Sequence, residues 1–150
     1  MLEVIAGGCR CGAVRYTVDR ATLPAAYACH CTDCQTWSGS SFTTQFFMPA
    51  DALHVTGVVT DYAFVNPMGR VSTQRFCPTC HTRLYNSNAA RPHLVNIRAG
   101  TLDDSARIRV PLHIWVRSKQ PWVILPDDAE LWQEAASVDA LERLSGMDSV

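Results

Sequence analysis

Apolar and polar residues alternate in short segments along most of the chain, a pattern that is typical of β-strands rather than helices. In residues 13–18, Val14, Tyr16 and Val18 share one side, as in a half-buried strand. Further short runs rich in β-branched and aromatic residues predict strands at 41–48, 61–65, 71–76, 93–98 and 112–116. Pro49 and the Ala-Asp-Ala after it predict a single helical turn, and residues 66–69 predict a tight turn. We therefore expect a mainly β protein of mostly antiparallel strands.

The pattern changes after Pro126. Apolar residues then recur at helical spacing as far as Gly146: Leu131, Trp132, Ala135, Val138, Leu141 and Leu144. This spacing predicts one or two helices in a C-terminal tail. We therefore expect two parts, a β-domain over residues 1–126 and a helical tail over residues 127–150.

Composition narrows the class of protein. A chain of 150 residues with 47% hydrophobic residues is long enough for one folded domain with a core. Its 13 basic and 14 acidic residues give a net charge of -1, which argues against nucleic acid or an anionic membrane as a partner. No apolar run approaches the roughly 18 residues of a membrane span, and the first residues lack a leader pattern. We therefore expect a cytoplasmic protein.

The seven cysteines carry the strongest chemical signal, because they form three clusters: Cys9 and Cys11; Cys29, Cys31 and Cys34; Cys77 and Cys80. Thiols in the cytosol stay reduced, so this spacing indicates metal ligands rather than disulfides. Residues two apart in a strand face the same side, which lets the first pair present both sulfurs to one ion. The last pair has the two-residue gap of a zinc knuckle.

The seven thiols divide most naturally into four and three. Structural zinc has four protein ligands, whereas catalytic zinc usually has three and an open position. Joining the middle cluster to either pair would put five thiolates on one ion and leave the other pair with two. We therefore predict two zinc sites per chain, a structural site and an open site. The structural ligands are Cys9, Cys11, Cys77 and Cys80, and the open-site ligands are Cys29, Cys31 and Cys34.

Two alternatives to the open site remain. All seven cysteines could be buried apolar residues, or a histidine could complete the middle cluster and make it a second structural site. The candidate histidines are His30, His81 and His113. Strand alternation turns His30 away from the face of Cys29 and Cys31.

The cysteines lie within the first three of five ordered segments that together form a recognisable pattern: residues 8–14; residues 29–34 with Ser38, Gly39 and Phe42; residues 75–80 with Leu84; residues 100–104; and residues 113–115 with Lys119 and Trp122. Spread over residues 5–125, this pattern resembles the glutathione-dependent formaldehyde-activating enzymes (GFA domain). Their zinc-binding β-tent fold is shared with centromere protein V. The resemblance implies the same division of the cysteines between two zinc ions. It also implies a carbon–sulfur lyase that joins formaldehyde to glutathione as S-hydroxymethylglutathione.

Two positions depart from the family pattern. Gln35 stands where an arginine often follows the third cysteine, which weakens the expectation of an anionic substrate. His81 stands where a glycine usually follows the knuckle, so it must adopt a turn conformation that glycine takes more easily.

An open zinc with three thiolates suits thiol chemistry better than water activation, because a soft thiol can become its fourth ligand. Held beside an aldehyde, that sulfur could add to the carbonyl carbon, and the reverse step would cleave the same bond. Around this catalytic cluster of Cys29, Cys31 and Cys34, Trp37 and Phe42 could wall the pocket. We predict that Ser38 donates a hydrogen bond to the developing oxyanion. Arg75 could meet a substrate carboxylate.

Other functions are also compatible with the sequence. The main alternative is a non-catalytic, zinc-stabilised binding module, and a redox or metal sensor is another. A macromolecule-binding module would be expected to carry a basic extension, whereas residues 127–150 are acidic. We therefore expect a small-molecule thiol or aldehyde partner such as glutathione, no nucleic acid and no membrane. The amphipathic tail with Trp132 could dock on the β-body or on a second subunit, which leaves a homodimer open.

Overall fold

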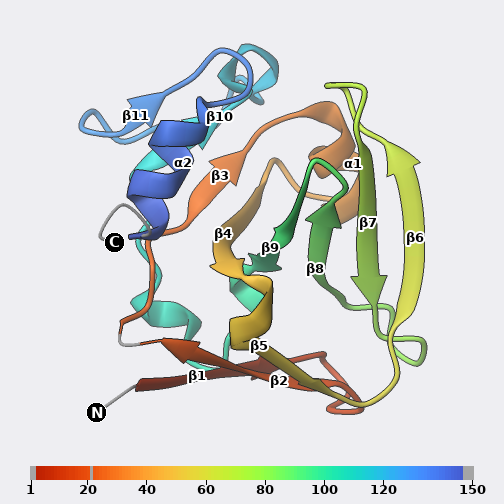
Figure 1. The fold of residues 1–150 in the computed structure, drawn as a ribbon. Coiled ribbons are helices and arrows are strands. Elements are labelled where there is room, and N and C mark those ends of the chain that lie inside the picture. The colour runs from red at the N-terminus through yellow and green to blue at the C-terminus, as the bar shows by residue number, and fades with distance from the viewer. Residues whose placement is uncertain (1–2, 21, 147–150) are drawn as a thin grey trace. The chain divides into compact units, whose positions relative to one another are not determined.

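The structure, a computed structural model, describes residues 3–20 and 22–146 (Figure 1). The chain divides into two units. The first contains Met1–Leu23 and Phe47–Arg107, and the second contains Pro24–Phe46 and Ile108–Val150. Strands predominate, so the predicted mainly β class is confirmed.

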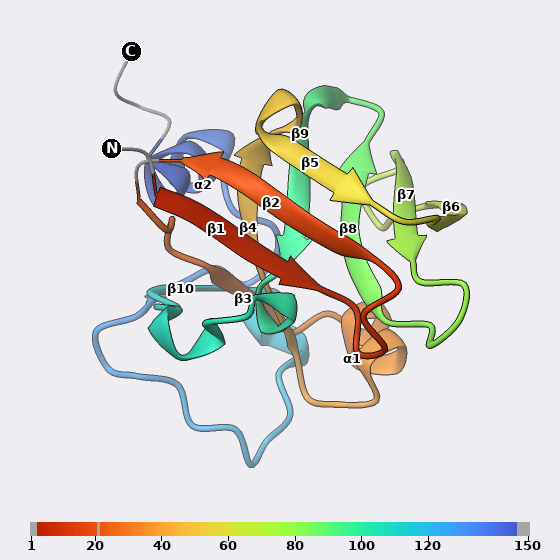
Figure 2. The ribbon, with the colours of Figure 1, turned by 90° about the horizontal axis from the view of Figure 1, so that it is seen from below.

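A small antiparallel sheet opens the first unit. Its strands, in the order β1-β2-β5, are β1 (Glu3–Gly8), β2 (Arg15–Arg20) and β5 (Leu53–Thr56). They lie side by side in Figure 2. Val14, Tyr16 and Val18 are at most 3% exposed, which confirms the alternation predicted for this segment. The single helical turn predicted after Pro49 is the 3-10 helix η1 (Ala50–Ala52).

An antiparallel meander forms the rest of the first unit. Its strands are β6 (Thr60–Val65), β7 (Val71–Phe76), β8 (Arg83–Asn88) and β9 (Arg91–Arg98), followed by the 3-10 helices η2 (Ala99–Thr101) and η3 (Ser105–Arg107). The tight turn between β6 and β7 is confirmed. Asn66 N–H donates to Arg70 O at 2.8 Å, and Gly69 takes a positive φ of 74°.

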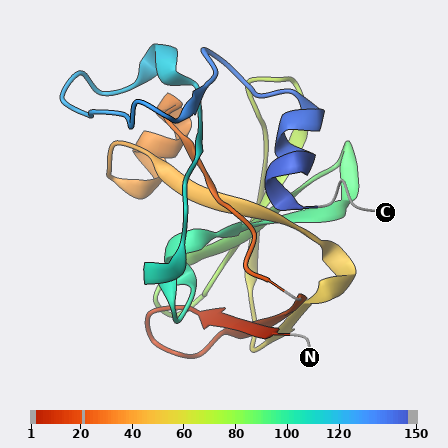
Figure 3. The same cartoon turned by 90° about the vertical axis from the view of Figure 1, so that its left-hand side faces the viewer.

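The second unit contains short strands and both α-helices, α1 in orange and α2 in blue in Figure 3. Its elements are β3 (Tyr27–Cys29), α1 (Thr32–Ser38), the start of β4 (Thr43–Pro49), β10 (Leu112–Ile114), the 3-10 helix η4 (Val116–Ser118), β11 (Glu130–Leu131) and α2 (Val138–Ser145). β3 pairs antiparallel with β4, whereas β10 pairs parallel with both β3 and β11. The sheets are therefore mostly, but not wholly, antiparallel.

The C-terminal helix is confirmed but shorter than the periodicity predicts. α2 begins after Ser137, whose side chain accepts a hydrogen bond from Ala140 N–H, and ends at Gly146 in the left-handed conformation. Residues 131–135, where the helical spacing begins, are not helical. There Trp132 N–H donates to His113 O at 2.9 Å, and Glu130–Leu131 form β11. Pairing with β10 replaces local helical hydrogen bonds. Residues 147–150 of the predicted tail lie outside the described residues, and the boundary at residue 126 stays a prediction.

Neither α-helix in the described part of the chain can cross a membrane. The longer one, α2, has 8 residues, whereas a span needs about 20.

Candidate metal centres

Four cysteines of the first unit bring their sulfurs together. The Sγ atoms of Cys9, Cys11, Cys77 and Cys80 all lie within 4.8 Å of one another. Cys9 Sγ is 3.5 Å from Cys11 Sγ, which is 3.7 Å from Cys77 Sγ. A tetrahedral zinc with Zn–S bonds of about 2.3 Å separates its sulfurs by about 3.8 Å. The donor type, number and spacing therefore fit a zinc ion.

The first pair is presented by a turn rather than by a strand. Cys9 follows the end of β1, and Cys9 N–H donates to Val14 O while Gly12 N–H donates to Cys9 O. Gly12 has a φ of 82°, which lets the chain reverse within these few residues. The two sulfurs meet as predicted, but the strand alternation used to predict it is not the cause.

The second pair lies on the turn between β7 and β8. His81 N–H donates to Cys77 O at 2.9 Å, and His81 adopts a φ of 62°, which confirms the left-handed turn expected at this position. The Thr82 hydroxyl lies 3.1 Å from Cys80 Sγ. Hydrogen bonds from the side chain and backbone of Thr82 lower the pKa of Cys80 to about 5. This thiol therefore favours the thiolate form that metal binding requires.

The middle cluster forms in the second unit. The sulfurs of Cys29, Cys31 and Cys34 also lie within 4.8 Å of one another. Cys29 ends β3, and Cys31 caps the N-terminus of α1 by accepting a hydrogen bond from Cys34 N–H at 3.3 Å. Contacts with the thiols of Cys31 and Cys34, together with burial, raise the pKa of Cys29. A cation among the three sulfurs would attract the thiolates and lower their pKa values, so the cluster also fits a metal ion.

No histidine joins the middle cluster within the described residues. His30 is fully buried, with its Nε2 2.9 Å from Nδ1 of His113 and its ring 5.0 Å from that of Phe42. Burial lowers the pKa of His30 to about 4 and also lowers that of His113, so both rings are neutral at pH 7 and one donates to the other. His81 belongs to the turn of the four-cysteine cluster. The three sulfurs therefore have no fourth protein ligand among the described side chains.

Other residues singled out from the sequence lie as follows. Ser38, at the end of α1, donates its hydroxyl hydrogen to Cys34 O at 2.8 Å. Trp37 and Phe42 are half-buried. Arg75, on β7 of the first unit, forms an ion pair with Asp61 at 3.0 Å. Its guanidinium therefore already has a carboxylate partner.

Several supporting contacts were not predicted from the sequence. They include the Thr82 hydroxyl beside Cys80, the His30–His113 pair and the hydrogen bonds of Gln35 described below. The Thr82 contact is local to the turn of Cys80, whereas the His30–His113 pair and the Gln35 bond to Ser118 O join residues 83 positions apart. The sequence offered only one signal, the unusual residue Gln35 after Cys34.

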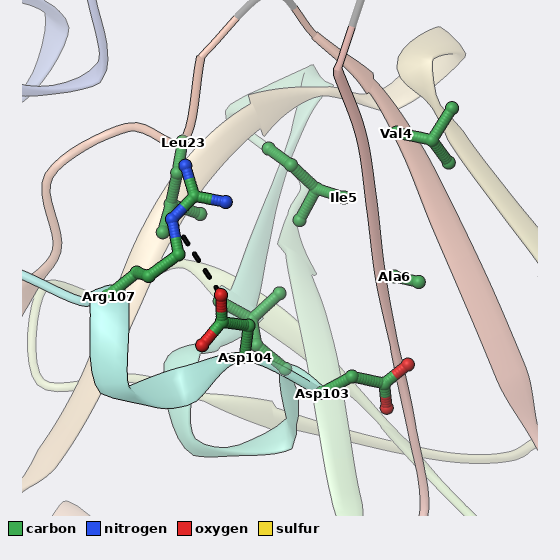
Figure 4. Close-up of a pocket in the computed structure, with 8 residues that line it drawn as sticks. Val4, Ile5, Ala6, Leu23, Asp103, Asp104 and Arg107 are labelled. Atoms are coloured by element: carbon green, nitrogen blue, oxygen red, sulfur yellow. Dashed lines mark ion pairs between the residues drawn. The ribbon is translucent and has the colours of Figure 1, made fainter.

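The first unit also holds a cavity of about 260 Å³ that contains no cysteine (Figure 4). Its lining is Val4, Ile5, Ala6, Leu23, Leu102, Asp103, Asp104 and Arg107. Arg107 is turned toward Asp104 at 3.8 Å, and Asp103 pairs with Arg15. Asp103 belongs to the 100–104 segment singled out from the sequence. Its ion pair with Arg15 lowers the pKa of its carboxyl group.

Fold and clusters together define a mainly β protein that could bind two metal ions through cysteine. Residues 4–118 match the family described as glutathione-dependent formaldehyde-activating enzyme, and the chain belongs to this GFA family.

Individual relatives agree with this assignment. A Halomonas elongata protein that carries the provisional name of a glutathione-dependent formaldehyde-activating enzyme is 27% identical over 128 residues, covering 80% of each chain. The crystal structure of a Rhodobacter sphaeroides protein, determined as a structural-genomics target, matches with a TM-score of 0.54 at 19% identity. That match covers 85% of this chain and 98% of the other, and it concerns the fold alone.

Proposed function

We propose that the protein is a zinc-dependent enzyme of thiol–aldehyde chemistry, a carbon–sulfur lyase acting on an adduct of the S-hydroxymethylglutathione type. The observation that carries the proposal is the group of three converging sulfurs without a fourth ligand among the described residues. Membership in the GFA family supports glutathione as the thiol and formaldehyde as the aldehyde.

In this proposal the two clusters have different roles. Cys9, Cys11, Cys77 and Cys80 hold a structural zinc, because four thiolates complete its coordination. Cys29, Cys31 and Cys34 hold a second zinc, which supplies a position that a substrate thiol can occupy as thiolate. Cys31 is only half-buried, which supports access from solvent on its side of the cluster. Reduced thiols are needed at both sites, which supports a cytoplasmic location.

The proposed reaction balances without another reactant. The thiol sulfur forms a bond to the carbonyl carbon, the C=O π bond opens, and the thiol proton ends on oxygen as the hydroxyl of the adduct. The reverse reaction breaks the same carbon–sulfur bond and returns the proton to sulfur. The side chains must therefore hold the thiol next to the aldehyde and stabilise charge on the oxygen.

Ser38 is our candidate for the hydrogen bond to that oxygen. Ser38 is exposed and follows Cys34 by one helical turn, but its hydroxyl donates to Cys34 O and accepts a hydrogen bond from Ser40 N–H. It must rotate away from this carbonyl to act. We expect Ser38→Ala to lower kcat with little effect on metal content, whereas Ser40→Ala, two residues along the same exposed segment, should behave as wild type.

A metal count and a thiol titration test the proposal. We expect two zinc ions per chain, and we expect glutathione to change the absorption of the Co²⁺-substituted protein. Cys31→Ser should abolish that change. Two bound ions with a Co²⁺ spectrum that glutathione leaves unchanged would favour a zinc-stabilised binding module. A single zinc ion per chain under zinc excess would contradict the presence of an open site.

A further inference from the structure

The three sulfurs of the middle cluster are carried by two elements that meet at His30. Cys29 is the last residue of β3, whereas Cys31 and Cys34 belong to the start of α1. His30 alone separates Cys29 from Cys31, so the backbone there sets how far apart their sulfurs lie. His30 is fully buried, and its N–H donates to Ile114 O at 3.0 Å.

The side chain of Gln35 ties this joint to the segment after β10. Its Nε2 donates to His30 O at 2.8 Å and to Ser118 O at 2.9 Å. Its Oε1 accepts a hydrogen bond from Gln120 Nε2 at 2.7 Å. A side-chain amide offers two N–H donors and one carbonyl oxygen, and all three groups are engaged here. The hydroxyl of Ser118 adds a second hydrogen bond to His30 O at 3.1 Å.

We propose that Gln35 is a positioning residue for the three-cysteine site. It holds the β3–α1 joint in place through His30 O, and so keeps Cys29 within reach of the ion that Cys31 and Cys34 bind. The inference rests on the proposed function, because it requires a metal ion at these sulfurs. Outer contacts of this kind typically change metal affinity by about 10- to 100-fold.

The chemistry of the contacts explains why an amide is needed. His30 O and Ser118 O are both acceptors, so the side chain between them must donate twice. A glutamate would place carboxylate oxygens against these carbonyls. A methionine would fill similar space but leave both carbonyls, and the Gln120 amide, without this partner.

A Co²⁺ titration of the full-length chain tests the role. The part of the Co²⁺ spectrum that Cys31→Ser removes marks the three-cysteine site. We expect Gln35→Met to weaken Co²⁺ binding at that site by about 10- to 100-fold and to change its d–d absorption, with the four-cysteine site unchanged. Thr36→Ala, at the exposed neighbouring position of α1, is the matched control and should bind Co²⁺ as wild type does.

Gln120→Ala provides a second variant in case Gln35→Met does not fold. It removes only the bond to Oε1, so it should produce a smaller loss of affinity at the same site. Equal weakening of both sites by Gln35→Met, or no change in either variant, would overturn the positioning role and leave the proposed function standing. A wild-type chain that binds no Co²⁺ at the three cysteines would overturn both.

Discussion

At the residue scale, the backbone takes part in presenting the cysteines. An amide N–H donates to sulfur in each part of the two clusters: Val14 to Cys9 at 3.2 Å, Cys34 to Cys31 at 3.3 Å and Cys80 to Cys77 at 3.5 Å. Sulfur is a hydrogen-bond acceptor, so each of these contacts ties a cysteine side chain to the backbone of its own turn. They require a particular backbone path around each cysteine, so the local turn matters as much as the ligand.

Replacing one ligand of each cluster separates their roles. Cys77 is fully buried. Structural zinc contributes about 10–16 kcal/mol of binding free energy in small zinc peptides, which is as large as the whole free energy of unfolding of a typical domain, about 5–15 kcal/mol. We therefore expect Cys77→Ser to unfold the protein. Cys31→Ser should cost less stability and abolish the thiol response. Thermal melts of the two variants measure this, and equal destabilisation would mean that both clusters are structural.

His81 offers a second test at this scale. A φ of 62° lowers the stability of the folded state by roughly 1–2 kcal/mol for a residue with a side chain. Glycine avoids this strain, although its more flexible unfolded chain offsets part of the gain. We expect His81→Gly to raise the free energy of unfolding by up to about 1 kcal/mol, measured by denaturant titration at saturating zinc. His81→Ala keeps the backbone strain and should give no gain. A similar gain from alanine would attribute the effect to losing the imidazole instead.

At the scale of elements, the sequence predicted several strands rich in β-branched and aromatic residues, but it missed β1 and β5. Val14, Tyr16 and Val18 revealed β2, and the residues 71–76 predicted as a strand coincide with β7. β8 was not predicted, because polar residues dominate it and Leu84 alone is buried. Its pairing with β7 and β9, not its own pattern, makes it a strand. The three-residue β3 is likewise too short to show a period.

For the same reason, the sequence predicted the cysteine groups better than their surroundings. Ligand spacing within each pair and within the triple is local, and the number of ligands per ion joined the two pairs into one group. The sulfurs of each predicted group do lie close together. The contacts of His30 and Gln35 join residues more than 80 positions apart, so no local pattern announces them. The parallel register of β10 with β3 is equally non-local.

Gly7 shows how tightly β1 packs against its neighbours. A Cβ added there would lie 2.3 Å from the Tyr16 hydroxyl oxygen and 2.5 Å from Thr101 O. These two residues also hydrogen bond through their hydroxyls at 2.8 Å. We expect Gly7→Ala to lower the free energy of unfolding by about 1–3 kcal/mol, as overpacking does. Gly100→Ala, where a Cβ meets nothing within 4 Å, is the control, and equal losses in denaturant titrations would contradict the steric explanation.

At the scale of the whole molecule, each cysteine cluster belongs to one unit. The four-cysteine cluster draws its ligands from both chain segments of the first unit, and the three-cysteine cluster lies within one segment of the second. The C-terminal residues belong to the second unit, where Glu130 N–H donates to Pro111 O and Trp115 N–H to Glu134 O. The proposed tail therefore supports the strand next to β3.

Truncation after Pro126 tests the proposed division of the chain. We expect residues 1–126 to fold around the four-cysteine cluster, all of whose ligands they keep. The fragment should nevertheless melt at a lower temperature, since it loses β11, α2 and the buried Ala140 and Leu141. Zinc content and a thermal melt of this fragment measure both effects. An insoluble product without zinc would contradict the division at residue 126.

The interleaving of the two ligand sets also has a consequence for biosynthesis. A nascent chain exposes Cys9 and Cys11 first and then Cys29, Cys31 and Cys34, so five thiols are available before Cys77 and Cys80 have been translated. At that stage the three-cysteine cluster already has all of its thiols, whereas the four-cysteine cluster has only half of them. The four-cysteine cluster can form only once β7 and the turn after it have left the ribosome. Gln120, which donates a hydrogen bond to Gln35, is translated later still. If both clusters bind zinc as proposed, the translation order therefore predicts that the three-cysteine site can load first and the four-cysteine site only late in synthesis or after release.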